Sequence, residues 1–583
     1  MKDEDKLTKI RHSLAHILAE AVLNLFPETK TAIGPAIDNG FYYDFEFVNN
    51  ITEKDLNLLE KEMQRIIKLK NKFEKQEIKE LEALKIFKSN PYKKELLEEI
   101  IKNNQPITIY NSGNFSDLCE GEHIESTEEI DPQSFKLDRI AGAYWRGDEK
   151  NKMLTRIYGL AFSNKKELDE YLEKRQETEK RDHRKLGKEL DLFCFSEIVG
   201  AGLPLFTPKG TIIKDELQKH IESVCRRYGF EKVSTPHLAK IDLYELSGHA
   251  KKFGNELFRV SSSAGHSFVL KPVQCPHQTQ IYASRPRSYR DLPIRYMESE
   301  KQYRAEKTGE VGGLTRVYAI TVEDGHSFCR PDQVRQEIIN MVNIIKDFYT
   351  SLGLWDNHWV SLSVRDYNHP EKYIGEATDW DECEKILEEI ASELKLDAKR
   401  CEGEAALYGP KLDFMFRDAL GKEIQIPTVQ LDFATPKKFN LIYKDKDGSD
   451  KNPIMIHRAI LGSYERFMAL LIEHFAGAFP LWLSPVQVKI LPIGEKQFPY
   501  AKEIADELKN NNIRVENNTD DETLGKKIRQ AKIEKIPYLI VLGEKEMTDK
   551  MITIEERGKE KGEKMSLNDF IEKLKTEIKK AKN

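Results

Sequence analysis

The segment NKKELDEYLEKRQETEKRDHRKLGKELDLF, residues 164–193, constrains the fold of this chain more than any other. It has no proline and is dense in charged residues with high helix propensity, so it predicts a helix. Its leucines form only a narrow apolar stripe, which leaves most of the helix surface in solvent. Because one hydrophobic core rarely serves a chain of 583 residues, we expect residues 166–190 to be a helical linker between domains.

The two sides of this linker differ in pattern. Residues 1–165 mix helices with short strands such as GFYYDFEF and QPITIY. Residues 191–484 hold strands broken by glycine and proline. They also hold helices such as TIIKDELQKHIESVCRRYGF and HRAILGSYERFMALLIEHFAG, which favours a large antiparallel sheet flanked by helices. Residues 485–583 alternate strand and helix, as in a small α/β domain with a partly parallel sheet. The prediction is a multidomain α+β protein.

Composition limits the setting in which this chain works. Charged residues make up 33% and hydrophobic residues 39%, and there is no run of about 18 apolar residues, so we expect no membrane span. The start MKDEDKLTKIRHSLAHI is too charged for a secretory signal. The seven cysteines are scattered, which suits a reducing cytoplasm. The net charge of −6 gives no global case for nucleic acid, although a local basic face can bind RNA.

A glycine-rich loop carries arginines on both of its sides. In YRAEKTGEVGGLTRVYAI, Arg304 and Glu306 precede the loop and Arg316 follows it. If the flanking strands pair, both arginines approach one anionic ligand, and guanidinium groups suit phosphate oxygens. Glu306 could then accept a hydrogen bond from an adenine amino group. Arg466 follows His457 by nine residues in an expected helix and adds a further cation. Ordinary surface ion pairs are the alternative for each arginine.

Cys275, in LKPVQCPHQTQIY, is a lone cysteine beside a proline. A structural zinc site would normally show paired ligands such as CxxC, and none is present here. Most cysteines of this kind are buried and inert. Local spacing leaves both interpretations open, a metal ligand and a buried thiol.

A second group of potential ligands lies near the start of the chain. RHSLAHILAE places His12 and His16 at i, i+4 on one face of a helix. FSDLCEGEHIEST adds Cys119 and His123, also four apart, with Asp117 nearby. These two pairs indicate a second zinc site, and an amphipathic helix with incidental histidines is the alternative.

Several phrases of the sequence resemble a known family. YRDLPIRYMESEKQYRAEKTGEVGGLTRV, GSYERF and RRYGFEKVSTPHL resemble motifs 2, 3 and 1 of class II aminoacyl-tRNA synthetases. AGAYWRGDEKNKMLTRIYG, RDHRKLGKELDLF, YGPKLDF and MIHRAILGSYERF resemble threonyl-tRNA synthetases specifically, and the resemblance runs from about residue 8 to 580. It implies an editing domain at 1–165, a class II catalytic domain at 191–484 and an anticodon-binding domain at 485–583. The small N-terminal domain that many relatives carry is not expected here.

The resemblance also implies an ATP-dependent threonine–tRNA ligase that forms threonyl-adenylate and transfers threonine to tRNA(Thr). Arg304 would contact the α-phosphate as a catalytic residue, Glu306 the adenine N6 and Arg316 the γ-phosphate, with Mg²⁺ accompanying ATP. Fixed guanidinium groups stabilise the charge that builds up in the transition state. The other implied contacts to ATP are Arg466, Gln425 and Thr428.

For Cys275 the resemblance offers an answer, because it joins this residue to His326 and His457 as ligands of one Zn²⁺ per subunit. Three protein ligands leave a position open for substrate. In the family the zinc binds the amino and hydroxyl groups of threonine, and Asp324 helps to hold them. The resemblance further assigns Tyr408, Lys411 and Gln430 to the amino-acid pocket and His249 to proton transfer.

Zinc recognition has a consequence for accuracy. Valine lacks the hydroxyl group of threonine and is rejected strongly. Serine keeps the hydroxyl group and lacks only a methyl group, a difference that allows roughly 10–200-fold discrimination between the two amino acids. A corrective site is therefore expected. The resemblance assigns deacylation of Ser-tRNA(Thr) to the first domain and leaves open whether a metal binds there, while histidines suit general-base work near neutral pH. The implied editing residues are His12, His16, Asp117, Cys119 and His123.

Some positions depart from the family pattern. QCPHQ stands where NCPGH is usual, and TVEDGH, with Val322, stands where TQDDAH is common. Ile320 replaces an aromatic residue expected to stack on adenine. CEGEH replaces CRGPH, which puts Glu120 and Glu122 beside the editing cysteine. The ligand and arginine positions survive, so activity is the preferred interpretation, with editing more affected than synthesis.

The resemblance implies tRNA(Thr) as partner, a homodimer through motif 1, and stacking on anticodon bases by the last domain. Three rivals stay open on the sequence: an RNA-binding regulator without activation chemistry, a deacylase in which only the first domain works, and a class II relative charging another amino acid such as proline. The candidate tRNA-binding residues are Lys526, Lys527, Glu546 and Arg557.

Overall fold

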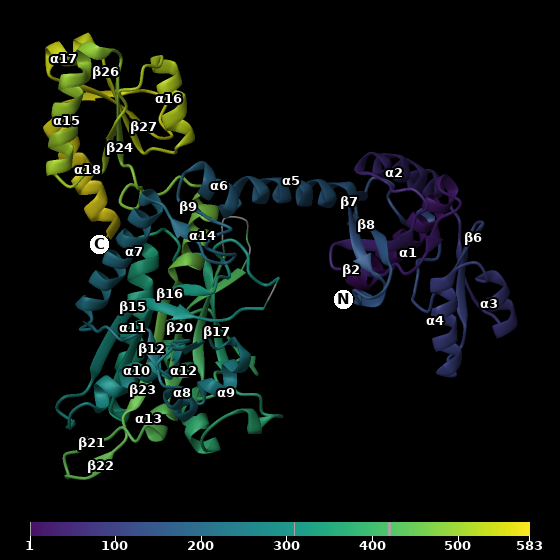
Figure 1. Cartoon of the computed structure of the whole chain (residues 1–583), viewed down its shortest axis with the longest axis horizontal. Coiled ribbons are helices and arrows are strands. Elements are labelled where there is room, and N and C mark those ends of the chain that lie inside the picture. Colours follow the sequence, from purple (N-terminus) through teal and green to yellow (C-terminus); the bar gives the residue numbers. More distant parts are fainter. Residues whose placement is uncertain (1, 308, 418–420, 422, 583) are drawn as a thin grey trace. The chain divides into compact units, whose positions relative to one another are not determined.

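The computed structural model describes residues 2–307, 309–417, 421 and 423–582. The chain forms two compact units, residues 1–177 and 178–583 (Figure 1). No helix among the described residues is long and apolar enough to cross a membrane.

The first unit is built on a sheet with strand order β1-β3-β8-β7, in which β2 also pairs with β3. Leu14, Leu18 and Val22 repeat at helical spacing along α1 and are fully buried, because they pack with strand residues such as Phe41. A smaller sheet, β4-β5-β6, shares its own core with α3 and α4. The elements are α1 Lys2–Leu25, α2 Glu53–Lys68, α3 Glu80–Ile86, α4 Pro91–Lys102, β1 Lys30–Thr31, β2 Ala36–Ile37, β3 Gly40–Glu46, β4 Phe73–Glu77, β5 Thr108–Ser112, β6 Phe115–Leu118, β7 Phe135–Tyr144 and β8 Met153–Ala161.

The expected linker, residues 166–190, is two helices and not one. α5 (Lys165–Arg181) ends before Asp182, and α6 (His183–Glu189) begins after it. The Asp182 carboxylate accepts a hydrogen bond from Arg184 N at 2.7 Å, which caps α6 and starts a new helix at that point. The division between the two compact units falls within α5.

The second unit contains a large sheet with strand order β11-β15-β16-β23-β20-β19-β17-β18. The inner pairs are antiparallel, and only the edge strands β11 and β18 pair in parallel. Its strands are β11 Glu231–Lys232, β15 Ile294–Tyr303, β16 Ala319–Cys329, β17 His358–Val364, β18 Ala398–Glu402, β19 Lys411–Arg417, β20 Glu423–Asp432 and β23 Ile454–Ser463.

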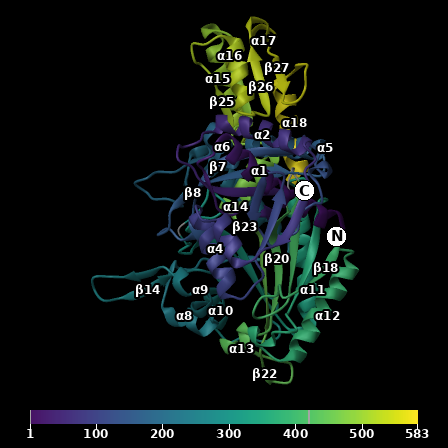
Figure 2. The same ribbon diagram turned by 90° about the vertical axis from the view of Figure 1, so that its right-hand side faces the viewer.

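Helices cover both faces of this sheet. In Figure 2, α11 and α12 lie on one side, with α8, α9 and α10 on the other. The main core joins apolar residues of α7, α11, α12 and α14 to those of the strands. Short strand pairs complete the domain: β9 with β10, β21 with β22, and β12 and β13 with β14. The elements are α7 Pro208–Arg227, α8 Ile241–Ser247, α9 His249–Phe253, α10 Cys275–Ala283, α11 Val334–Thr350, α12 Ala377–Glu393, α13 Thr435–Lys438, α14 Tyr464–Phe475, β9 Phe193–Cys194, β10 Leu205–Phe206, β12 Leu238–Ala239, β13 Arg259–Ser261, β14 Ser267–Leu270, β21 Tyr443–Lys444 and β22 Asp450–Lys451.

The prediction of one helix through His457 and Arg466 is wrong. His457 lies in strand β23, and the helix α14 begins only at Tyr464. The residues MIHRAIL are apolar enough to be buried as either element, and here they fill the gap between β16 and β20 in the sheet. The Ser463 side chain accepts a hydrogen bond from Arg466 N at 3.2 Å and so caps the helix where the strand ends.

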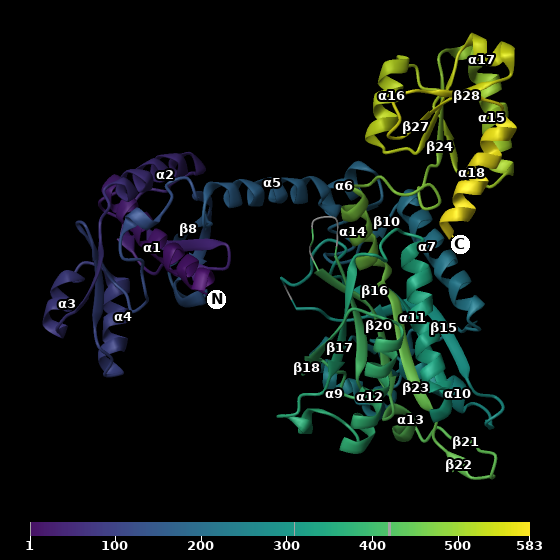
Figure 3. The ribbon, with the colours of Figure 1, turned by 180° about the vertical axis from the view of Figure 1, so that it is seen from behind.

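The last part of the chain is a sheet with order β25-β24-β26-β27-β28, parallel at β25-β24-β26 and antiparallel beyond. Figure 3 shows α16 on one face of this sheet, with α15 and α18 on the other. Each face has its own apolar cluster. The elements are β24 Val488–Pro492, β25 Val515–Asn517, β26 Tyr538–Leu542, β27 Ile552–Glu556, β28 Glu563–Met565, α15 Phe498–Asn510, α16 Leu524–Ile533, α17 Glu544–Asp549 and α18 Leu567–Lys582.

The packing of α7 on the large sheet gives a testable expectation. Leu217 is fully buried in the main core, so Leu217→Ala removes apolar contacts and leaves a cavity. We expect a loss of about 2–5 kcal/mol in the unfolding free energy of this domain, measured by urea denaturation. Lys219→Ala, on the exposed side of the same helix, is the control and should change it by less than about 0.5 kcal/mol. Equal effects of the two changes would contradict this packing.

Candidate functional site

A cavity of about 1080 Å³ opens over β15, β16, β20 and β23 of the large sheet. Strands bring to it residues that are far apart in the sequence, because an antiparallel sheet places distant segments side by side. Of the residues that the sequence predicted for this domain, His326 alone is not part of the cavity wall. The others line it: His249, Cys275, Arg304, Glu306, Arg316, Asp324, Tyr408, Lys411, Gln425, Thr428, Gln430, His457 and Arg466.

Three potential metal ligands meet at one end of this cavity. Cys275 begins α10, whereas His326 and His457 lie directly opposite each other in the register of β16 and β23. The sulfur atom and one nitrogen of each imidazole lie within 4.8 Å of one another, and all three residues are buried. The two imidazole rings meet edge to face, with their centroids 4.7 Å apart. These residues are separated by 51 and 131 positions, so only the fold brings them together.

The surroundings of this group fit a bound cation. His326 Nδ1 lies 2.7 Å from Gln278 Oε1, while its buried Nε2 has no hydrogen-bond partner among the described residues. His457 Nε2 donates to the Asp432 carboxylate at 2.8 Å, which frees Nδ1 for a metal. Burial raises the pKa of Cys275 well above its usual range, so a cation is needed to hold its sulfur as thiolate. A buried thiol–imidazole site that also presents an orphaned ring nitrogen suits Zn²⁺.

The floor beside the three ligands is polar. Tyr408 stacks on His457, with centroids 5.0 Å apart, and its hydroxyl donates to Gln430 Oε1 at 2.7 Å. Burial raises the pKa of Asp324 to about 7. A cationic group held beside Asp324 would stabilise the carboxylate, which suits an amino group. Lys411 is bound to Asp413, with Nζ 2.5 Å from the carboxylate oxygen.

The arginines that line the cavity differ in their present partners. The Arg304 guanidinium lies over the Phe253 ring, 5.0 Å from its centroid, a contact that sequence reasoning missed. Arg316 is ion-paired with Glu306 at 2.7 Å and with Glu310 at 2.9 Å. An incoming polyphosphate would therefore exchange with these carboxylates at Arg316. Arg466 is exposed on the first turn of α14.

His249 lies at the start of α9 and is buried in the cavity wall. Its Nδ1 is 2.8 Å from Ser247 Oγ. Burial lowers the pKa of His249 to about 4, so the imidazole is neutral at pH 7 and can accept a proton.

The first unit holds a separate cluster. His12 and His16 of α1 meet Cys119 and His123, and one ligand atom of each lies within 4.8 Å of the others. Cys119 Sγ is 3.4 Å from His12 Nε2 and 3.5 Å from His123 Nε2. Burial lowers the pKa of His12, His16 and His123, and it raises the pKa of Cys119 to about 11. At pH 7 the cluster is neutral, so the lone pairs of its imidazoles are free to accept a hydrogen bond or to bind a metal.

Asp117 joins this cluster to residues that the sequence did not indicate. It pairs with Lys93 at 2.5 Å and accepts from the Tyr43 hydroxyl at 2.5 Å, and all three residues are buried. His16 Nε2 lies 3.9 Å from the same carboxylate. Lys93 comes from α4 and Tyr43 from β3, so no local motif could have shown them.

The two glutamates of CEGEH turn away from this cluster. Glu120 and Glu122 are exposed, and Glu122 pairs with Lys9 at 2.6 Å. Only the backbone carbonyl of Glu122 approaches the cluster, at 3.3 Å from His12 Nδ1. Gly121 between them is required for packing, because a Cβ there would lie 2.4 Å from the His12 ring.

The four candidate RNA contacts of the last domain have different environments. Lys526 is exposed, with its ammonium on Glu522, whereas Lys527 is buried and donates to the carbonyls of Pro492 and Asn518. The prediction is therefore wrong for Lys527, because α16 turns it into the domain. The Glu546 carboxylate accepts from Gly543 N and Thr553 Oγ1, at 2.9 Å each. Arg557 is exposed and donates to the carbonyls of Lys535, Ala478 and Phe479.

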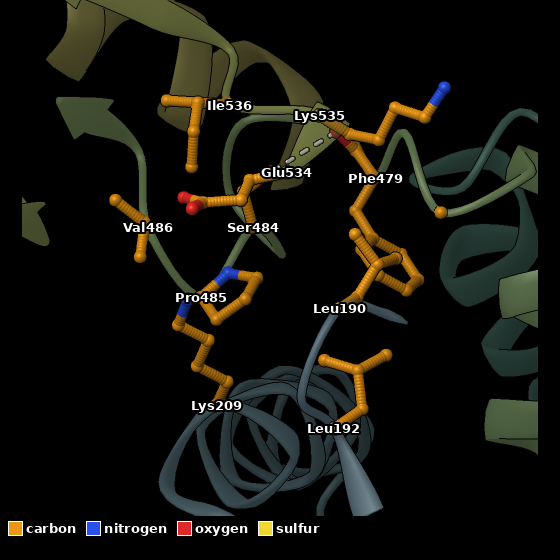
Figure 4. Close-up of a pocket in the computed structure, with 11 residues that line it drawn as sticks. Leu190, Leu192, Lys209, Phe479, Ser484, Pro485, Val486, Glu534, Lys535 and Ile536 are labelled. Carbon is orange, nitrogen blue, oxygen red and sulfur yellow. Dashed lines mark hydrogen bonds between the residues drawn. The ribbon is translucent and has the colours of Figure 1, made fainter. Parts of the chain in front are cut away.

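A second cavity, of about 20 Å³, lies near α7 (Figure 4). Leu190, Phe479 and Ile536 are among the side chains that line it. Its volume is enough for about one water molecule. We therefore place the candidate site in the larger cavity.

Family models match three separate parts of the chain. Residues 107–158 match the threonyl and alanyl tRNA synthetase second additional domain. Residues 258–475 match the tRNA synthetase class II core domain (G, H, P, S and T), and residues 487–577 match an anticodon binding domain. Most residues that line the cavity on the large sheet lie within the second match, although His249, Lys252 and Phe253 precede it, and Cys119 and His123 lie within the first.

Whole-chain relatives agree with these matches. The chain is 47% identical to a threonine–tRNA ligase of Gloeobacter violaceus over 573 residues, which cover 96% of this chain and 90% of the relative. It is 46% identical to the threonine–tRNA ligase of Cytophaga hutchinsonii, over 98% and 88% of the two chains. The structure titled as the RNA binding domain of threonyl-tRNA synthetase from Cryptosporidium parvum superposes with a TM-score of 0.64 at 34% identity. That match covers 68% of this chain and 98% of the other.

The raised pKa of Cys119 predicts slow thiol chemistry. With a pKa of about 11, roughly one thiol in a thousand is ionised at pH 8, and the thiolate is the reactive form. We expect iodoacetamide to modify Cys119 much more slowly than the exposed Cys194 at pH 8, as measured by peptide mass spectrometry. The rate at Cys119 should rise steadily towards pH 10. Equal rates at pH 8 would show that Cys119 is not a shielded thiol.

Proposed function

Because this chain belongs to the threonine–tRNA ligase family, we propose that its large cavity activates threonine with ATP and selects it through a zinc ion held by Cys275, His326 and His457. The class II core implies ATP with Mg²⁺. One observation carries the zinc proposal. Three ligands from distant segments converge within 4.8 Å, and two of them, Cys275 and His457, line a cavity that also holds the arginines of a nucleotide site.

Activation begins when the threonine carboxylate attacks the α-phosphorus of ATP, which forms threonyl-adenylate and releases pyrophosphate. We assign Arg304 to the α-phosphate, where its guanidinium stabilises the negative charge that develops. Arg316 exchanges Glu306 and Glu310 for the γ-phosphate, and Glu306 is then free to accept from the adenine amino group. Arg466, Gln425 and Thr428 line the rest of the adenosine path.

Transfer moves threonine from the adenylate to the 3′-hydroxyl of the terminal adenosine of tRNA(Thr). That hydroxyl must lose a proton as it attacks. We assign His249 to this proton, because the imidazole is neutral at pH 7 and lies in the cavity wall.

Selection of the amino acid depends on the three buried ligands. Cys275, His326 and His457 would hold a Zn²⁺ ion, which would offer coordination to the amino and hydroxyl groups of threonine. We assign Asp324 to the amino group of threonine. Tyr408 and Gln430 also line the pocket and are hydrogen-bonded to each other. Lys411 lines the same wall of the cavity. Valine offers no hydroxyl group and so leaves this position unsatisfied.

Serine also carries a hydroxyl group, so the zinc site would accept it and some tRNA(Thr) would receive serine. The cluster of the first unit would correct this error. We propose that His12, His16, Cys119 and His123 hydrolyse Ser-tRNA(Thr), with the negative charge of Asp117 beside His16. The neutral imidazoles support water activation, and Cys119, held as a thiol, acts as a hydrogen-bond partner and not as a nucleophile.

Other partners follow from the same assignment. We propose that Lys526 and Arg557, both exposed, meet tRNA in the last domain. A homodimer through motif 1 is supported by exposed apolar side chains between β9 and β10, next to α7, where Ile198 is 99% exposed. All seven cysteines are free, which supports a cytoplasmic location.

Amino-acid selection is tested by ATP–pyrophosphate exchange. We expect exchange with threonine and serine and almost none with valine, because a site built for a hydroxyl group rejects its absence by roughly 10⁴–10⁵-fold. Cys275→Ala should lose both the zinc, measured by elemental analysis, and the exchange. Cys329→Ala changes a different buried cysteine, at the end of β16, and is the matched control. It should keep both the zinc and the exchange activity. Turnover of valine equal to that of threonine would refute selection through a metal.

Editing is tested separately with His123→Ala. This change should slow the deacylation of Ser-tRNA(Thr) by roughly 10²–10⁴-fold, as expected for loss of a general base, and leave threonine-dependent exchange intact. Lys9→Ala, on the exposed side of the same cluster, is the control. The zinc content of the protein shows whether this cluster acts with or without a metal. One ion per chain would mean that the cluster holds no metal, and two ions per chain would mean that it is a second metal site. Deacylation unchanged in His123→Ala would remove this cluster from the reaction.

A further inference from the structure

The turn that carries Cys275 continues into a buried chain of hydrogen bonds that leads away from the cavity. Gln278, in the first turn of α10, has its Oε1 2.7 Å from His326 Nδ1. Its Nε2 donates to Glu298 Oε2 of β15 at 3.3 Å. Gln278 is 0% exposed and Glu298 is 1% exposed, so bulk water does not compete for these groups. The amide of Gln278 therefore connects a proposed metal ligand to a buried carboxylate.

The carboxylate of Glu298 is fixed from its far side. It accepts from Thr235 N at 2.6 Å and from Thr235 Oγ1 at 2.9 Å. The Lys271 ammonium lies 3.7 Å from Glu298 and donates to Thr235 O at 3.2 Å and Oγ1 at 3.0 Å. Lys271 is also fully buried. The Lys271 charge compensates the Glu298 carboxylate in an interior without bulk water. The carboxylate is therefore held in place and takes part in hydrogen bonds only as an acceptor.

This arrangement decides which way the Gln278 amide points. One end of the amide donates hydrogen bonds and the other accepts them. Reversing the amide would place its oxygen against the Glu298 carboxylate and its NH₂ group against His326 Nδ1. Two acceptors facing each other without water are strongly unfavourable. Glu298 therefore holds the NH₂ group towards itself and turns the Gln278 oxygen towards His326.

The direction of the amide in turn decides the tautomer of His326. An oxygen acceptor next to Nδ1 requires the imidazole hydrogen to be on Nδ1, which leaves the lone pair on Nε2. Nε2 is the buried nitrogen that lacks a hydrogen-bond partner within the described part of the chain. The Asp324 carboxylate, at 3.8 Å from it, is beyond hydrogen-bond reach. The free lone pair is the one that a metal needs.

We propose that Glu298 is a positioning residue for the metal site: through the Gln278 amide it fixes His326 in the one tautomer that can bind the ion. Thr235 and Lys271 hold Glu298 in place. This inference rests on the proposed zinc site and adds to it Gln278 and Glu298, neither of which is a metal ligand, together with Thr235 and Lys271 behind them. Gln278 lies in QCPHQ, the turn that departs from the usual pattern, and here its amide oxygen supplies the acceptor for the ligand.

The decisive variants are Glu298→Gln and its combination with Gln278→Glu. Glu298→Gln removes the obligatory acceptor and frees the Gln278 amide to reverse. We expect the zinc affinity of the full-length protein, measured by competition with a chromophoric chelator, to fall roughly 10–100-fold. In the double variant the carboxylate at 278 accepts from His326 Nδ1 and from the amide at 298. The tautomer is then fixed again, and the affinity should return to within a few-fold of wild type.

A second readout observes the tautomer without zinc. In the metal-free protein labelled with ¹⁵N-histidine, the His326 ring signals, assigned by their loss in His326→Gln, should show one tautomer in wild type and in the double variant. Glu298→Gln should show a mixture. Glu337→Gln, at another buried carboxylate that contacts Arg295 and Ser327, is the control and should change neither readout.

The possible outcomes separate the two proposals. Wild-type affinity in Glu298→Gln, or no recovery in the double variant, would overturn the positioning role. If the single change only destabilised the fold, the zinc affinity and the melting temperature would fall in the single and the double variant alike. Recovery of zinc affinity in the double variant would exclude that explanation. A wild-type protein that takes up no zinc would overturn the metal assignment, while the tautomer signals would still decide whether Glu298 controls His326.

Discussion

The pairing of β16 with β23 is the interaction on which the site depends. It sets His326 opposite His457 and, one residue along, Gly325 opposite Arg458. Side chains alternate across a sheet, so His457 faces the cavity while Arg458 is buried on the other side, where it pairs with Glu323 at 2.7 Å. A slip of one residue would turn the imidazole to the opposite face of the sheet and bring the guanidinium into the site. The buried ion pair and the ligand set thus enforce the same register.

The chemistry of both sites depends on withdrawing polar groups from water. Burial keeps His249 and the histidines of the first unit neutral at pH 7, and it holds Cys119 as a thiol. The structure offsets the cost of this burial with fixed partners, such as Asp432 for His457 and Lys93 for Asp117. Each partner comes from a different element of the fold from the residue it supports. The sites are therefore as rigid as the domains that carry them.

Much of this organisation was readable from the sequence, and the limits have physical causes. The change of pattern at residue 191 and the i, i+4 spacing of His12 and His16 both reflect local periodicity, which a sequence displays directly. The meeting of Cys275 with two distant histidines depends on strand order, and local spacing does not contain it. The segment around His457 is apolar enough for helix or strand, and tertiary pairing made it a strand. Lys527 was misplaced because helix α16 turns that position inwards.

The state of Arg316 before nucleotide arrives has a consequence for selectivity among anions. Its guanidinium is already paired with Glu306 and Glu310 near the surface, where solvent and salt weaken such pairs. Under the proposed function, a triphosphate anchored elsewhere in the cavity would replace both carboxylates at once, and guanidinium groups bind phosphate oxygens well. Arg316 would then favour a ligand that is already bound at another point of the cavity over a small ion that binds at Arg316 alone.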